Sequence, residues 1–144
     1  MTVEPPDPPA EDLNWEEVLA WLPTFAHAGF HPGHWSRGEE QAPGVRTIPW
    51  VDYADDVLEF VRELYDLHVV APFDWGSWVQ ERGNELLADP QRLEEASLEE
   101  CRMLLAAHVR ADRFTDGHLL HAFKSGHIAA ILNRAGSLIG RSPK

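Results

Sequence analysis

The stretch ADDVLEFVRELYDLH, residues 54–68, decides the fold class of this sequence. Mostly apolar side chains recur in it every three or four residues, at Ala54, Val57, Leu58, Val61, Leu64, Tyr65 and His68. Charged side chains fill most of the positions between them, at Asp55, Asp56, Glu59, Arg62, Glu63 and Asp66. This spacing predicts an amphipathic helix that buries one stripe against a core.

Helix-start signals continue downstream of this segment. Asp74 can cap a helix that carries two Trp residues, and Ser97 with Glu100 forms a capping box. The helix after Ser97 is expected to turn these side chains inward: Leu98, Cys101, Leu104, Leu105, His108 and Val109. Two more helices are predicted, one capped by Thr115 or Asp116 and one after the break at Gly126.

Upstream of residue 54 the signals are weaker. Residues 1–11 are rich in Pro and predict a disordered tail, and Asp12 or Asn14 can cap a short helix ending near Leu22. Residues 29–49 form a long Gly- and Pro-rich loop, which is uncommon unless it packs over something or binds a ligand. We find no strand pattern.

The predicted fold is therefore all-α, a compact single-domain bundle of five to six helices over residues 12–140. The long loop lies in the first third of this domain. A disordered tail of residues 1–11 precedes the domain, and a flexible end of residues 141–144 follows it. The length of 144 residues suits one domain, and 44% apolar with 25% charged residues excludes a disordered chain.

Cysteine usage and hydropathy predict the compartment. The single Cys101 cannot form an internal disulfide, so the fold does not depend on an oxidising environment. No apolar run approaches the roughly 18 residues of a membrane span. The start of the chain lacks the basic and apolar regions of a secretory signal. We therefore expect a cytoplasmic protein that does not contact a membrane.

The charge is distributed unevenly. The net charge is −12, and residues 1–108 hold 22 acids against 6 Arg, whereas residues 109–144 hold 2 acids against 6 bases. An acidic body argues against general nucleic-acid affinity, because phosphate contacts dominate that affinity. The basic quarter leaves two alternatives open: a local anion site, or docking of this quarter against the acidic body.

The segment HVRADRFTDGH, residues 108–118, collects the side chains best suited to chemistry. Arg110 and Arg113 stand just before a predicted helix start, where free N–H groups favour a phosphate or carboxylate, and His118 titrates near neutrality. The alternative is an ion-pair cluster, with Arg110 and Arg113 bound to Asp74, Asp112 or Asp116.

Several short motifs resemble a family of uncharacterised bacterial helical domains. The family recurs with Phe-Asp-Trp, Arg-x-Asp-Arg-Phe-x-x-Gly-His and Ser-Gly, which stand here at residues 73–75, 110–118 and 125–126. The resemblance covers about residues 50–135 and implies no known activity. It implies that these residues form one binding constellation: Asp74, Trp75, Arg110, Asp112, Arg113, Gly117 and His118.

A second resemblance is to the HEPN ribonucleases, small helical proteins with an Arg followed four to six residues later by His. Arg113 and His118 have this spacing, and so do Arg102 and His108. The resemblance implies metal-independent RNA cleavage, with His118 as acid or base and Arg113 on the phosphate. The motif usually has a polar residue after Arg, where this sequence has Phe114.

The histidines do not predict a metal site. Zinc needs three or four converging ligands. Gly29, Pro32 and Gly33 keep the upstream histidines off a regular helix, and there is no Cys pair beside the downstream ones, His118, His121 and His127. We expect neither a metal nor another cofactor.

Three functional hypotheses follow. We interpret the chain as a binding or interaction module rather than an enzyme, with a protein partner or a phosphate-bearing ligand at Arg110, Asp112, Arg113 and His118, joined by Asp74 and Trp75. The second hypothesis is a ribonuclease with Arg113 and His118 as catalytic residues. The third is an acidic protein that binds a basic partner through residues 52–100.

Overall fold

A computed structural model gives the fold of this chain and describes residues 8–36, 40–46, 49–72, 74–88, 90–112, 115 and 117–139. The helical elements before the longest helix are η1 (Ala10–Asp12), α1 (Trp15–Leu19), α2 (Leu22–Ala26), α3 (Asp55–Asp66), α4 (Trp75–Trp78), η2 (Val79–Gly83), α5 (Asn84–Ala88) and α6 (Pro90–Leu93). The last three are α7 (Leu98–Ala111), α8 (His118–Lys124) and α9 (His127–Leu138). The predicted all-α class is confirmed in that the fold is mostly helical, with a small hairpin besides.

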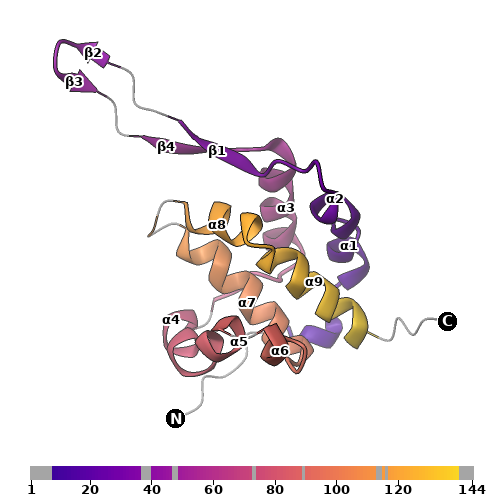
Figure 1. Cartoon of the computed structure of the whole chain (residues 1–144). Helices are drawn as coiled ribbons and strands as arrows, with labels where there is room; N and C mark the ends of the chain where they lie inside the picture. Colours follow the sequence, from indigo (N-terminus) through magenta and orange to yellow (C-terminus); the bar gives the residue numbers. More distant parts are fainter. Residues whose placement is uncertain are drawn as a thin grey trace.

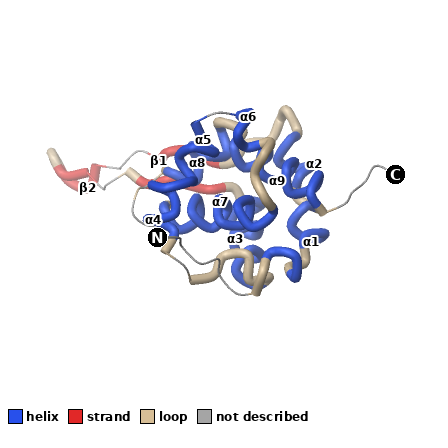
Figure 2. The backbone as a smooth tube through the Cα atoms, turned by 90° about the horizontal axis from the view of Figure 1, so that it is seen from below, coloured by secondary structure: helices blue, strands red, loops and turns tan. Residues whose placement is uncertain are grey.

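The central element is α7, which packs against η1, α4, η2, α8 and α9. Figure 1 shows α7 in the middle of the helical body, and Figure 2 shows it enclosed by other helices from a second direction. All of its residues from Cys101 to Val109 are buried, including His108, which was predicted to face inward. A helix that is buried around its whole circumference forms the core of the fold.

An aromatic cluster ties α2 and α3 to α8. Phe25 lies at the centre, with its ring centroid 4.8 Å from that of Phe60 and 4.9 Å from that of Phe123, both edge to face. Trp21 stacks on Phe25, and Phe30 also contacts it. Such edge-to-face pairs add to the stabilisation from apolar burial.

The predicted helix over residues 54–68 is confirmed as α3, but its buried face was partly misplaced. The core face carries Val57, Phe60 and Leu64, all fully buried. Leu58 is 50% exposed and Tyr65 is 40% exposed, so these two residues of the predicted stripe do not lie in the core. The segment has apolar residues on two adjacent faces, and only one of them packs inward.

The long Gly- and Pro-rich loop contains strands that the sequence did not indicate. Strands β1 (Gly33–Ser36) and β4 (Trp50–Tyr53) pair antiparallel, and β2 (Glu40–Ala42) pairs with β3 (Val45–Arg46). We call the β1–β4 pair the ribbon. Figure 1 shows it passing above α8 and leading to the β2–β3 hairpin, which projects from the helical body. Four-residue strands show no clear alternation, so composition alone predicted a loop.

The pairing register sets the two faces of the ribbon. Gly33 stands opposite Tyr53 and Trp35 opposite Val51, so these four share one face. The other face carries His34, Ser36, Trp50 and Asp52. Tyr53 and Trp35 contact residues of the α7–α8 connection, so the first face lies toward the body.

The expected disordered tail ends earlier than residue 11. Ala10 is fully buried in η1, its N–H donates to Glu99 Oε1 at 2.9 Å, and its carbonyl accepts from Trp15 Nε1 at 2.7 Å. The carbonyl of Pro8 accepts from Arg102. The segment from Pro8 onward therefore packs on α7, and residues 1–7 lie outside the described part of the chain.

Several predicted caps are present. Asn14 accepts a hydrogen bond from the N–H of Glu17 at α1, Asp74 does so from Ser77 at α4, and Ser97 forms the full capping box with Glu100 at α7. Gly126 separates α8 from α9 with φ of 85°, as a helix break requires. In the residues described, every helix is too short or too polar to span a bilayer.

Candidate functional site

The connection from α7 to α8 is held to the ribbon by one carboxylate and one phenol. Asp112 Oδ1 accepts hydrogen bonds from Tyr53 Oη at 2.8 Å and from the N–H of Leu119 at 3.0 Å. The same Tyr53 oxygen accepts from the N–H of Leu120 at 3.1 Å. These bonds satisfy two N–H groups of the first turn of α8, which have no partner inside the helix.

This network replaces the predicted cap of α8. The N-cap residue is Gly117, which supplies no side-chain bond, so Thr115 is not the cap, and Asp116 lies outside the described residues. Gly117 has φ of 87°, and a Cβ there would lie 2.5 Å from the ring of Trp35. Glycine is needed for both reasons, the left-handed backbone and the close approach of the indole.

Three histidines from three helices lie close together near the start of α8, and we call them the histidine cluster. Nδ1 of His108, on α7, lies 2.9 Å from Nε2 of His118, on α8. The ring centroid of His127, on α9, lies 6.1 Å from that of His108. His108 is only 4% exposed, and its Nε2 has no hydrogen-bond partner among the described residues.

Burial lowers the histidine pKa values in the cluster. Desolvation is the largest cause for His108, whose pKa falls to about 3, and the other histidines add repulsion. Desolvation also lowers the pKa of His118 and of His127, while Asp112 acts in the opposite direction on His118. Desolvation disfavours a cation, so the cluster is neutral at pH 7.

The structure brings together only some of the residues predicted to share a site. Asp112 and His118 are neighbours across the α7–α8 connection, and Arg110 lies in the last turn of α7 with a buried Nε that has no described partner. Arg113 lies outside the described residues. Asp74 and Trp75 begin α4, where the Asp74 carboxylate caps its own helix through Ser77.

A groove that sequence reasoning missed lies next to this connection. It has a volume of about 350 Å³ and runs between α3 and the α7–α8 connection. Its lining is mainly apolar: Tyr53, Val57, Leu58, Val61, Tyr65, Val109, Asp112 and Leu119. The available signal was the surplus of apolar residues in 54–68, which exceeds what one buried stripe needs.

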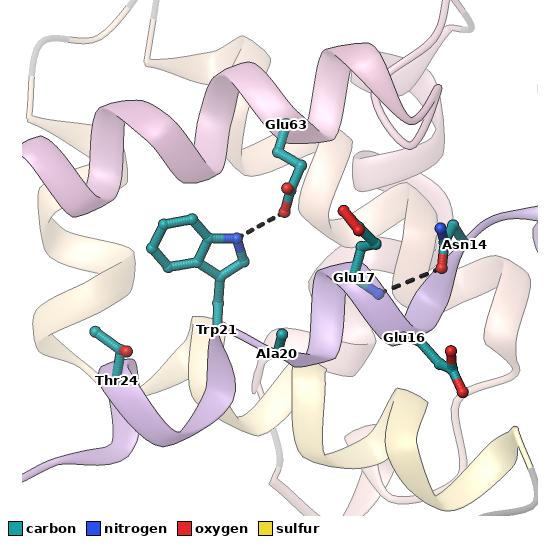
Figure 3. Close-up of a pocket in the computed structure, with 7 residues that line it drawn as sticks. All are labelled: Asn14, Glu16, Glu17, Ala20, Trp21, Thr24 and Glu63. Carbon is teal, nitrogen blue, oxygen red and sulfur yellow. Dashed lines mark hydrogen bonds between the residues drawn. The ribbon is translucent and has the colours of Figure 1, made fainter.

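A second pocket, of about 520 Å³, is acidic and lies between α1, α2 and α3. Figure 3 shows Glu63 beside Trp21, whose Nε1 donates to Glu63 Oε1 at 2.7 Å, with Glu16 and Glu17 on the neighbouring helix α1. No basic side chain lines this pocket among the residues described. This pocket adds to the negative surface on the α3 side of the molecule.

The described residues contain no converging group of three His, Cys, Asp or Glu side chains that could hold a metal ion. In the histidine cluster, two ring nitrogens face each other directly. The arrangement therefore provides a neutral polar contact between helices α7 and α8.

Comparison with known proteins gives one match. A family model described as a family of unknown function matches residues 10–141, nearly the whole chain. No curated protein and no solved structure matches the chain. The expected relationship to an uncharacterised family thus holds at the level of the family.

Proposed function

The chain belongs to the DUF6508 family, a family of unknown function, and we propose that it is an interaction module whose groove binds an apolar helix of a basic protein partner. The observation that carries this proposal is the exposure of Leu58 and Tyr65 in a preformed, mainly apolar groove. Large apolar side chains gathered at one concave surface are typical of binding sites.

The spacing of the groove residues on α3 favours a helical partner. Leu58, Val61 and Tyr65 follow one another at three and four residues, so they form a continuous ridge along one face of α3. Val109 and Leu119 form the opposite wall. An amphipathic helix that places its own apolar stripe between two such walls is a recurring mode of recognition.

Charge favours a basic partner. Beyond the groove, the exposed surface of α3 carries Asp55, Glu59 and Asp66 against Arg62. The acidic pocket of Figure 3 lies on another side of the same helix, and the whole chain has a net charge of −12. Lys and Arg residues flanking the apolar stripe would be steered to this surface and held in register.

This proposal joins two of the sequence hypotheses, the interaction module and the acidic protein with a basic partner. The anion site at Arg110, Asp112, Arg113 and His118 and the ribonuclease based on Arg113 and His118 stay predictions. In the described part of that turn, Asp112 bonds α8 and His118 contacts His108.

The test uses a peptide of about 14 residues built from Leu and Lys in an amphipathic helical pattern. Amide NMR spectra of the labelled full chain are recorded during its titration, and the same composition in scrambled order serves as the control peptide. We expect shifts confined to residues around Leu58, Val61 and Leu119. Shifts elsewhere, or equal affinity for the scrambled peptide, would overturn the proposal.

A matched pair of variants identifies the surface. Leu58→Ser removes a groove side chain, and Trp50→Ser removes a side chain of similar exposure, 47%, on the outward face of the ribbon. We expect Leu58→Ser to weaken the peptide about tenfold and Trp50→Ser to change its Kd less than about twofold. An equal effect of both variants would show that general hydrophobicity, not the groove, binds the peptide.

A further inference from the structure

The histidine cluster and one wall of the groove share the first turn of α8. His118 is the first residue of α8, and the next residue, Leu119, lines the groove. The N–H of Leu119 bonds to Asp112, which also lines the groove. The position of this wall therefore depends on the contacts that hold the first turn of α8 against α7.

We propose that the cluster of His108, His118 and His127 acts as a proton-sensitive closure of the groove, holding the α8 wall in place near neutral pH and releasing it in mild acid. This inference rests on the proposed function for the meaning of the groove. It concerns the regulation of that site and is carried by different residues.

The geometry of the pair limits how many protons it can hold. Nδ1 of His108 and Nε2 of His118 are 2.9 Å apart, so one nitrogen donates and the other accepts. An imidazole that has accepted a second proton has no acceptor nitrogen left. The contact therefore survives one added proton on the pair and is lost when both rings are charged.

The neighbouring histidines oppose added positive charge on the cluster. From α8, His121 acts on all three rings, and from α9, His127 acts on His108 and His118. From the end of α7, Asp112 is the one carboxylate that acts on the cluster among the described residues. Protonation of His118 and His127 would thus place two cations beside one anion at the α7–α8–α9 junction.

Burial of the three rings determines that acid favours release of the α8 wall. The lowered pKa values of His108, His118 and His127 mean that each ring binds a proton more weakly in place than when it is released to solvent. Protons therefore favour the released arrangement as the pH falls below about 6.5, the ordinary histidine pKa. Release of the α8 turn breaks the bonds of Leu119 and Leu120 to Asp112 and Tyr53.

The experiment measures hydrogen exchange of the full chain without any ligand. Protection factors, which correct for intrinsic exchange, are compared at about pH 7.5 and about pH 5.5 for the amides of Leu119 and Leu120, with Leu105 in α7 as the internal reference. We expect a drop of about tenfold or more at Leu119 and Leu120 that Leu105 does not show. Equal protection at both pH values would overturn the inference.

Variants assign the effect to the cluster. His118→Gln keeps a polar side chain that does not titrate, and we expect it to reduce the pH-dependent drop, because one of the three rings no longer binds a proton on release. His127→Gln, at a half-buried position, should reduce the drop and replaces His118→Gln if that variant does not fold. The control is His31→Gln, in the exposed loop before the ribbon, which should leave the drop unchanged. A drop of undiminished size in both cluster variants would overturn the inference.

A second measurement separates this inference from the proposed function. The Leu/Lys peptide is titrated at both pH values, and we expect its Kd to rise about fivefold or more in acid. If the peptide binds at neither pH while the protection drops, the proposed function fails and the histidine closure stands. If the peptide binds equally at both pH values, the regulatory inference is overturned.

Discussion

Arg102 donates a hydrogen bond from Nε to the backbone carbonyl of Val69 at 3.0 Å, from a side chain with no exposed surface. Its Nη2 donates to the carbonyl of His68 at 2.7 Å, and its Nη1 donates to Pro8. A buried guanidinium is tolerated when its fork of donors is paired in this way. The residue joins α7 to the segment after α3 and to the N-terminal segment.

Replacing Arg102 with Met should therefore destabilise the chain strongly. The variant leaves the buried carbonyl of Val69 without its donor, at a cost of about 1–3 kcal/mol, and also removes the part-buried bonds to His68 and Pro8. We expect a loss of at least about 3 kcal/mol in urea unfolding. Arg92→Met is the control, since Arg92 is half-exposed, and it should cost less than about 1 kcal/mol. A small loss for Arg102→Met would contradict the anchoring role.

Two alanine substitutions on α3 distinguish its faces. Phe60→Ala removes a fully buried ring from the aromatic cluster and should cost about 3–5 kcal/mol. Leu58→Ala removes a half-exposed side chain and should cost less than about 1 kcal/mol. Thermal or urea unfolding checks both values. Comparable losses would mean that Leu58 lies in the core after all.

Substitutions of two glycines with the same backbone conformation distinguish backbone strain from a steric clash of the added Cβ. Gly117 and Gly126 have φ of 87° and 85°, but only at Gly117 would a Cβ meet the ring of Trp35. Gly126→Ala should cost about 1–2 kcal/mol from the left-handed backbone alone. Gly117→Ala should cost more, and the excess should vanish in a Trp35→Ala background. An excess that persists there would show that the ribbon does not press on this turn.

The free energy of unfolding should decrease as the pH is lowered from about 6.5 to about 5, a range in which carboxylates contribute little. The pKa values of His108, His118 and His127 are lowered by folding, so the unfolded chain binds more protons below about pH 6.5. Each such proton gives a slope of about 1.4 kcal/mol per pH unit. His108→Leu should reduce the slope between about pH 6.5 and pH 5 in urea unfolding. An unchanged slope would contradict the burial of His108.

Cys101 should be unreactive in the folded chain. It is fully buried, and burial raises the pKa of its thiol to about 12. Because the thiolate is the reactive form, a thiol reagent should label the native protein only as it unfolds. Labelling rates with and without urea test this. Rapid native labelling would show that α7 opens locally at this position.

The sequence was most informative where structure depends on neighbours along the chain. Caps such as Asn14, Asp74 and Ser97 are local hydrogen bonds, so a few residues are enough to predict them. The choice between the two apolar faces of α3 was different, because it depends on Phe25 and Phe123, which come from other helices. Periodicity detects that a helix is amphipathic without saying which of two adjacent faces finds a partner.

The candidate site also combines features that depend on neighbours along the chain with features that depend on distant residues. The sequence placed Asp112 and His118 in one cluster because they stand close together along the chain. It did not place Tyr53 there, because the bond between Tyr53 and Asp112 joins residues 59 positions apart. The ribbon depends on this bond and on the contact of Trp35 with Gly117, so its strands could not be predicted from residues 29–53 by themselves.

The attachment of the first described residues to α7 bears on how the chain folds during synthesis. The partners of Pro8 and Ala10 lie 94 and 89 positions further along the chain, at Arg102 and Glu99. A ribosome adds about 5–20 residues per second, so these bonds have to wait several seconds after their first partner is made. During that interval η1 has no α7 to pack against and α1 has no α9, so the apolar side chains of the first segment stay uncovered until the second half of the chain emerges.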